Sequence, residues 1–146
     1  MRKTKIVVVM FAVFSSTLFS QAFVKQSTKT PMRDGVLLAA DIYRPNDELQ
    51  HPVILYRTPY NKNTDGFDDQ TIRLLNTLGY VYVAQDCRGR FSSAGVDSIF
   101  LNDGWGQLQD GYDTIEWIVQ QSWSNGTVAQ LGGSATGITT RRAAAA

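Results

Sequence analysis

The chain has 146 residues, of which 43% are hydrophobic and 18% are charged, a composition typical of one globular domain large enough to bury a core. Its 14 Lys and Arg residues nearly balance 13 Asp and Glu residues, so the basic excess that nucleic-acid binding requires is absent. A single cysteine excludes an intramolecular disulfide, and a single histidine excludes a His-rich metal site. We therefore expect a soluble globular domain with no nucleic-acid partner and no metal.

The amino terminus has the three parts of a secretory signal peptide. Basic residues precede an apolar run over 6–14, and small residues stand at Ser20 and Ala22, the two positions that a signal peptidase reads. The apolar run is shorter than the ~20 residues that span a membrane, which favours cleavage over an uncleaved anchor. The sequence therefore predicts a signal peptide over 1–22, cleavage after Ala22, and a secreted or periplasmic domain over 23–146 that is no longer attached to the membrane.

Short apolar runs bounded by turn residues predict five strands, and apolar residues at helical spacing predict three helices. The strands are expected over residues 24–30, 36–43, 52–57, 80–84 and 127–131. The helices are expected over about 69–78, from about Asp110 onward, and from Ala135 to the last residue. The pair Asp34-Gly35 is a strong hairpin signal, and the later strands alternate with helices. This order predicts an α/β fold with a mostly parallel sheet and an amino-terminal β-hairpin.

Several local expectations concern the ends of these elements. Asp110 is expected to cap the second helix, with Asp113 in its first turn interacting favourably with the helix dipole. Gly79 is expected to end the first helix, and residues 124–126 are expected to form a turn before the last strand. Arg88 is expected to tie its loop to carbonyls or carboxylates. The three tryptophans fit the core better than a substrate subsite.

The segment 132–137 follows a predicted strand, opens a predicted helix and reads Gly-Gly-Ser-Ala-Thr-Gly. A serine at such a junction sits on a tight, strained turn that exposes its hydroxyl at the carboxyl end of the sheet. Small neighbours are needed because strand and helix approach closely there, and the first helical N–H groups face an oxyanion formed at the serine. Thr136 stands where the common Gly-x-Ser-x-Gly pattern has its second glycine, which comes one residue later. From these residues alone, Ser134 is either a nucleophile or part of a glycine-rich turn without catalysis.

Longer stretches of the chain match a known family in order and approximate spacing. The matching blocks are residues 32–45, 57–62, 85–90 with Ser92 and Gly95, 110–117, and 123–128 leading to 132–134. In these blocks the chain resembles the CocE/NonD-type serine hydrolases, the peptidase S15 group that includes the X-Pro dipeptidyl-peptidases. Five blocks in one order are far more specific than the serine turn alone.

The resemblance implies an α/β-hydrolase core, of which residues 23–146 form the amino-terminal part. It implies that Ser134 is the nucleophile, that the backbone N–H of Ala135 forms part of the oxyanion hole, and that the Tyr60 phenol is the second donor. The family has tyrosine where this chain has Ala135, but either residue offers a backbone N–H. A neutral phenol with a pKa of about 10 can donate to developing negative charge without ionising. The implied substrates are small esters, amides or short peptides, including amino-acid esters and N-terminal dipeptides ending in proline, and no cofactor is implied.

A serine nucleophile needs a base and an orienting acid, which follow it along the chain in α/β-hydrolases. The only histidine, His51, precedes Ser134 at the entry to an early strand, where a solvated loop histidine is expected. The carboxylates Asp86, Asp110 and Asp113 also precede the serine and fit turn or cap roles better. The printed chain is therefore interpreted as an amino-terminal fragment truncated after the serine turn, and the part without the signal peptide is expected to show no serine-dependent ester turnover.

Two other functions remain open at this point. A non-catalytic secreted protein with a vestigial serine turn would also lack a histidine after Ser134 and could carry Ala135 in place of the family's tyrosine. A ligand-binding module would use a pocket around Tyr60 without chemistry. An acid and a histidine downstream would support the enzyme, and labelling of Ser134 by a fluorophosphonate would separate an enzyme from a binder.

Overall fold

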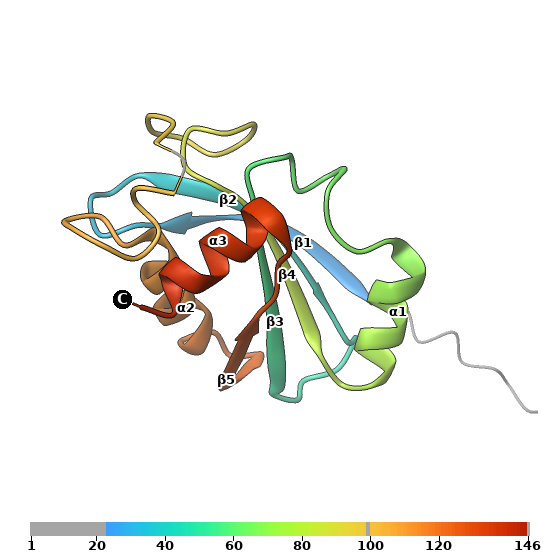
Figure 1. Ribbon diagram of the computed structural model, residues 1–146. Coiled ribbons are helices and arrows are strands. Elements are labelled where there is room, and N and C mark those ends of the chain that lie inside the picture. The colour runs from blue at the N-terminus through green and yellow to red at the C-terminus, as the bar shows by residue number, and fades with distance from the viewer. Residues whose placement is uncertain (1–22, 99, 146) are drawn as a thin grey trace, which may run out of the picture.

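The computed structural model describes residues 23–98 and 100–145, so the predicted signal peptide lies outside the described residues. These residues form one five-stranded sheet and three α-helices (Figure 1). The strands are β1 (Val24–Pro31), β2 (Leu37–Arg44), β3 (His51–Thr58), β4 (Val81–Asp86) and β5 (Ser124–Gln130). The helices are α1 (Asp69–Thr77), α2 (Asp110–Val119) and α3 (Ser134–Ala143). Each predicted element is present, and in this described part of the chain no helix is long and apolar enough to cross a membrane.

The strand order across the sheet is β1-β2-β4-β3-β5. Strand β2 runs antiparallel to both of its neighbours, whereas β4 pairs with β3, and β3 with β5, in parallel. Every strand except β2 therefore points the same way, which confirms the predicted amino-terminal hairpin on a mostly parallel sheet. The hairpin turns at Gly35, whose N–H donates to the Met32 carbonyl across 2.8 Å. The carboxyl ends of β3, β4 and β5 meet at one edge of the sheet, which we call the carboxyl edge.

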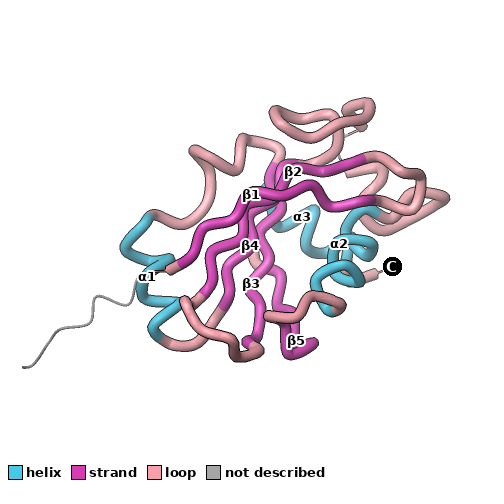
Figure 2. Tube along the Cα trace, turned by 180° about the vertical axis from the view of Figure 1, so that it is seen from behind, coloured by secondary structure: helices cyan, strands magenta, loops and turns pink. Residues whose placement is uncertain are grey.

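Side chains of the central strands alternate between two hydrophobic cores, one on each face of the sheet. On one face, Val53 and Leu55 of β3 pack in one cluster with Ile118 of α2. On the other face, Ile54 packs with Ile72 of α1. Figure 2 shows α2 and α3 grouped together, apart from α1. Helices therefore cover both faces, as expected for an α/β fold in which the parallel strands are buried on both sides.

Strand β5 begins earlier than predicted, because the expected Ser-Asn-Gly turn is a bulge within the strand. Ser124 pairs with His51, whereas Val128 pairs with Val53, so the register shifts between these two pairs. Gly126 accommodates the extra residues with a φ of +84°, in the left-handed region that favours glycine. The Asn-Gly pair correctly indicates an irregular backbone, but pairing with the neighbouring strand resumes after it and joins both parts into one strand.

Helix α2 begins at Asp110, as predicted, but Asp110 does not cap it. The N-cap residue is Gln109, whose side chain makes no capping hydrogen bond. The Asp110 carboxylate instead pairs with Arg88 at 2.6 Å, because a charge-assisted bond to a guanidinium is stronger than a bond to a neutral N–H. Helix α1 is capped at its start by Asp68 and ends just before Gly79, and this end confirms the prediction.

Candidate active site

The backbone turns sharply between β5 and α3, at the serine turn predicted from the sequence. Ser134 is the first residue of α3 and has a φ of +51°, in the left-handed region that residues with a side chain rarely adopt. Gly132 permits this bend, because a Cβ there would lie 2.3 Å from the backbone of Thr136. Gly133, in contrast, has no atom within 4 Å of its Cβ position. The predicted strain and close approach are both present, and of the two glycines only Gly132 is sterically required.

Thr136, the residue that departs from the usual pattern, closes the turn from within the helix. Its hydroxyl donates to the Gly133 carbonyl at 2.8 Å and accepts the Gly133 N–H at 2.9 Å. A threonine therefore holds the turn here with its side chain. Ser134 is exposed to solvent while Ala135 is buried, so the hydroxyl lies at the surface and the alanine methyl group packs inward.

The backbone N–H of Ala135 lies in the first turn of α3, where helix amides have no carbonyl partner within the helix. Such amides, together with the helix dipole, favour negative charge at this position. The turn therefore provides an exposed hydroxyl next to an amide that can donate to an anion.

Tyr60 reaches the same edge from the neighbouring strand. Strand β3 ends at Thr58 and runs parallel to β5, so Tyr60 and Ser134 each follow the carboxyl end of adjacent strands. The hydroxyl of Thr139 in α3 donates to the Arg57 carbonyl at 3.1 Å and joins the helix to the end of β3. The Tyr60 side chain is 56% exposed, so its ring is not packed into the core. Both predicted polar groups thus lie at the carboxyl edge.

A hollow of about 400 Å³ lies along the outer face of α3 and is lined by Ser134. Its wall also includes Trp105, Ile138 and Arg142, and the Arg142 guanidinium lies 5.0 Å from the centroid of the Trp105 ring. Trp105 is 60% exposed, so its assignment to the core is wrong. The other two tryptophans pack against the core cluster, as predicted. The hollow gives a group bound at Ser134 both apolar and cationic surroundings.

Arg57, near the carboxyl end of β3, is fully buried and is missing from the predicted site. Its Nη1 donates to the Asp103 carboxylate at 2.6 Å, and its Nε donates to the side-chain oxygen of Gln85 at 2.7 Å. Thr114 of α2 donates to the same Gln85 oxygen at 3.0 Å. The signal that could have found this group is an arginine inside an apolar run, because such a charge is stable only when it is paired.

The three carboxylates that precede the serine are all held by other groups. Asp86 accepts two backbone N–H groups from the loops of the carboxyl edge. Asp113 pairs with Arg33 at 2.7 Å. Asp110 pairs with Arg88, which also binds a second carboxylate, and the hydrogen bonds that Arg88 donates to Asp110 raise the pKa of Arg88. These carboxylates have structural roles, although Asp110 and Asp113 pair with arginines and do not fill the predicted turn or cap roles. Arg88 ties its loop to the body as expected.

The prediction of a solvated loop histidine is wrong, because His51 is only 8% exposed. Its ring nitrogens lie 2.9 Å from the Asp47 carboxylate and 3.0 Å from the Gly79 carbonyl. His51 starts β3, and at ~3.3 Å per residue the strand extends for about 23 Å between it and Thr58. His51 is therefore at the end of the strand opposite to Ser134 and is out of reach of the serine hydroxyl.

Neither the single cysteine nor a metal cluster offers a second candidate for an active site in the described part of the chain. Cys87 is 5% exposed, and burial raises the pKa of its thiol to about 11, so the thiol is neutral and unreactive at pH 7. Among residues 23–98 and 100–145, no group of three His, Cys, Asp or Glu side chains is arranged to hold a metal ion.

The sheet order and the likeness to solved hydrolase structures show that the chain forms part of an α/β-hydrolase fold, which confirms the predicted fold class. The family model for the X-Pro dipeptidyl-peptidase (S15 family) matches residues 34–146. The chain belongs to this family, so the resemblance noted in the sequence is confirmed.

Individual relatives agree with this assignment. The chain is 39% identical over 124 residues to cocaine esterase from Rhodococcus sp. (strain MB1 Bresler), an alignment that covers 83% of this chain and 21% of the esterase. The solved structure of an α-amino acid ester hydrolase shares 30% identity with a TM-score of 0.70, covering 92% of this chain and 24% of the hydrolase. A CocE/NonD family hydrolase from Staphylococcus aureus shares 26% identity with a TM-score of 0.73, covering 84% and 25% respectively. The chain spans about a fifth of the length of the curated relatives it matches.

Proposed function

We propose that Ser134 is the nucleophile of a serine hydrolase that cleaves ester or amide bonds through an acyl-enzyme. The observation that carries the proposal is the φ of +51° at Ser134, at the junction of β5 and α3. Backbone strain of this kind costs ~1–3 kcal/mol and persists only where the surrounding structure imposes it, which indicates a functional position. Family membership supports the proposal, because the matched relatives are esterases and peptidases.

In the proposed first step, the Oγ of Ser134 attacks the substrate carbonyl carbon while its proton passes to a base. Negative charge develops on the carbonyl oxygen, and the N–H of Ala135 and the phenol of Tyr60 donate to it. The alcohol or amine then leaves with a proton, and water hydrolyses the acyl-enzyme to release the acid. Removing one such donor costs roughly 10²–10³ in kcat.

The printed residues offer no histidine at the carboxyl edge, because His51 lies at the other end of β3 and is held by Asp47. We therefore expect residues 23–146 by themselves to show no Ser134-dependent ester hydrolysis. The measurement is the release of p-nitrophenol from p-nitrophenyl acetate by the purified chain and by its Ser134→Ala variant. Turnover well above buffer that disappears in Ser134→Ala would contradict the expectation.

The role of Ser134 is tested in a chimera that supplies the rest of the domain. Residues 23–146 replace the matching region of the Rhodococcus cocaine esterase, so that the remaining part of that enzyme provides the missing groups. We expect a fluorophosphonate probe to label the chimera, and Ser134→Ala to abolish both labelling and ester hydrolysis. Tyr60→Phe should lower kcat by roughly 10²–10³. Labelling that persists in Ser134→Ala would refute the proposal.

The proposed substrates are small esters, amides or short peptides, including amino-acid esters and N-terminal dipeptides ending in proline. Membership of the X-Pro dipeptidyl-peptidase family and the similarity to a cocaine esterase and an α-amino acid ester hydrolase support this range. The proposed chemistry uses no cofactor.

We also propose that residues 1–22 are a signal peptide that directs the protein to the periplasm or out of the cell. The layout of basic, apolar and small residues supports this proposal. The exported protein should then begin at Phe23, which amino-terminal sequencing would show, whereas a retained Met1 would refute the cleavage.

A further inference from the structure

Two lysines converge on one buried carboxylate beside the loop that carries Tyr60. Asp41 of β2 is 1% exposed and pairs with Lys62 at 2.9 Å and with Lys25 at 3.2 Å. Ser27 of β1 also donates to it, at 2.6 Å. Burial acts to raise the pKa of Asp41, but the hydrogen bonds from Ser27 and the lysines outweigh burial and lower the pKa below its usual value. Asp41 is therefore ionised at neutral pH.

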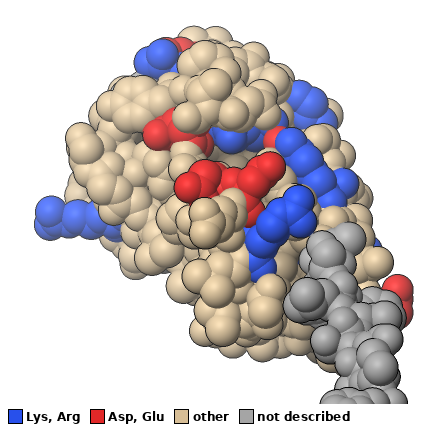
Figure 3. All heavy atoms as spheres, turned by 90° about the vertical axis from the view of Figure 1, so that its right-hand side faces the viewer, with Lys and Arg blue, Asp and Glu red and all other residues tan. Residues whose placement is uncertain are grey.

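The two lysines differ in how deeply they are buried. The side chain of Lys62 is 7% exposed, whereas that of Lys25 is 47% exposed. Burying an ammonium group is costly unless it is paired, so the interior position of Lys62 depends on Asp41. Lys62 also lines a hollow of about 300 Å³ together with Asp65 and Asp68. Figure 3 shows the side of the molecule that carries α1, where acidic and basic side chains lie close together.

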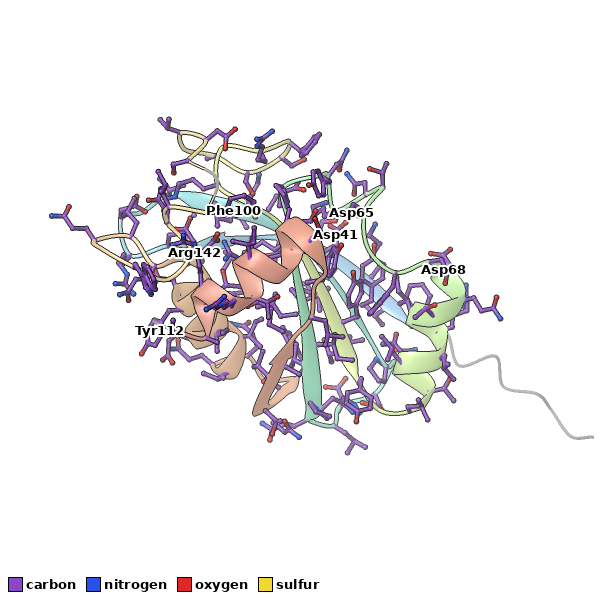
Figure 4. All side chains as sticks on the ribbon, in the orientation of Figure 1. Asp41, Asp65, Asp68, Phe100, Tyr112 and Arg142 are labelled. Atoms are coloured by element: carbon purple, nitrogen blue, oxygen red, sulfur yellow. The ribbon has the colours of Figure 1, made fainter. Side chains whose placement is uncertain are left out.

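The backbone of Lys62 is anchored as well as its side chain. Its N–H donates to the Asp86 carboxylate at 2.7 Å, and Asp86 is fully buried at the end of β4. Lys62 therefore links the loop after β3 to β2 through Asp41 and to β4 through Asp86. Asp65, further along the same loop, accepts the hydroxyl of Tyr56 at 3.0 Å. Figure 4 labels Asp41 and Asp65 near this end of the sheet.

The residue between Tyr60 and Lys62 has a strained backbone. Asn61 has a φ of +85°, a region that few residues other than glycine adopt, although asparagine tolerates it. The Asn61 carbonyl accepts the N–H of Asp65 at 2.8 Å and closes a turn. The Tyr60 ring is largely exposed and is not held by core packing, so the conformation of this backbone sets the direction of the Cα–Cβ bond that carries the phenol. Anchoring Lys62 therefore also fixes the direction in which the Tyr60 side chain projects from the backbone.

We propose that Lys62 is a positioning residue for Tyr60, acting through its buried ion pair with Asp41 and its backbone bond to Asp86. The inference rests on the proposed function only for the use of the phenol as an oxyanion donor, and the anchoring of Tyr60 is independent of that use. Lys25 provides a matched control, because it is the same residue type on the same carboxylate but belongs to β1.

The first test uses nuclear magnetic resonance on the 146-residue chain, with carbon-13 in the tyrosine rings and nitrogen-15 in the backbone. The Tyr60 ring signals are those lost in Tyr60→Phe. We expect Lys62→Met to shift and broaden these signals and the Asn61 amide signal, and Lys25→Met to leave both in place. Lys62→Arg keeps the cation and should restore the signals in part. Unchanged Tyr60 signals in Lys62→Met, or equal changes in Lys25→Met, would overturn the proposal.

If Lys62→Met does not fold, Lys62→Gln replaces it, because glutamine removes the ammonium group and hence the ion pair with Asp41, while its shorter polar side chain is less costly to bury beside a carboxylate than an apolar one. The same two outcomes then apply: altered Tyr60 signals support the proposal, and unchanged signals overturn it.

The second test measures catalysis in the esterase chimera. We expect Lys62→Met to lower kcat by up to about 100-fold while KM stays within about twofold, because a misplaced donor weakens binding of the transition state more than of the substrate. Lys25→Met should keep the parent kcat. An active chimera in which Lys62→Met also keeps the parent kcat would overturn the positioning role. An inactive parent chimera would count against the proposed function alone, and the resonance experiment would still decide the anchoring.

Discussion

The serine turn at Ser134 and the loop at Asn61 both lie at the carboxyl edge, and each holds a residue other than glycine in the left-handed backbone region. The serine turn is held by near neighbours, because Gly132 leaves room for the Thr136 backbone and Thr136 bonds the turn with its hydroxyl. The loop is held by remote buried carboxylates on β2 and β4, which bind Lys62. Similar backbone strain is thus maintained by local sterics in one segment and by long-range charge pairing in the other.

The largest loss of stability is expected at the carboxyl end of β3. This end is hydrogen-bonded to α3 and leads directly into the loop at Asn61. Asp103→Ala leaves the Arg57 guanidinium buried without its carboxylate. Removing one partner of a buried pair costs about 3–5 kcal/mol, so we expect urea denaturation to show a loss of that size in the free energy of unfolding. Arg90→Ala removes the more exposed pair with Asp97 and should cost less than about 1 kcal/mol. Equal losses in the two variants would show that burial of the Arg57 pair does not matter.

An intermediate effect is expected from local sterics in the serine turn. Gly132→Ala places a methyl group 2.3 Å from the Thr136 backbone and should lower the free energy of unfolding by about 1–3 kcal/mol. Gly133→Ala is the control, because its φ is −117° and its Cβ position is open. The control should stay within about 0.5 kcal/mol of the parent in urea denaturation. A larger loss at Gly133 would contradict the steric account.

The smallest change in stability is expected when each of the two residues in the left-handed region is replaced by glycine and thermal unfolding is measured. Ser134→Gly relieves about 1–2 kcal/mol of left-handed strain and loses part of this gain to glycine's backbone entropy, so a net stabilisation of roughly 0.5 kcal/mol is expected. Asn61→Gly should not stabilise, because asparagine tolerates this region and its side chain accepts the Asn63 N–H at 3.1 Å. Equal stabilisation by both substitutions would show that the left-handed conformation costs as much at Asn61 as at Ser134.

Most of the fold is predictable because its signals are local. The Asp-Gly hairpin, the alternating apolar runs and the Gly-Gly-Ser turn each depend on a few consecutive residues, and the structure contains all three. The errors occur where a distant group decides the outcome. Asp110 does not cap α2 because its carboxylate pairs with Arg88. His51 is buried beside Gly79, whose carbonyl lies within hydrogen-bonding distance of the imidazole ring.

The candidate site divides in the same way. Residue patterns and the family resemblance identify Ser134, Ala135 and Tyr60, and their catalytic roles stay predictions. Arg57 and Lys62 are missing from the predicted site. The apolar run around Arg57 indicates a buried, paired charge but not the carboxylate that pairs with it, and nothing near Lys62 in the sequence indicates that its side chain becomes buried.

The sequence by itself determined the order of strands and helices and the sharp turn at Ser134, since side-chain alternation and backbone sterics act between near neighbours. Only the tertiary structure decided which charges pair at the carboxyl edge. Lys62 meets Asp41 and Arg57 meets Asp103 across 21 and 46 residues of chain. The physical reason is that pairing inside a protein depends on distance and burial, which are defined only once the sheet has brought these strands together.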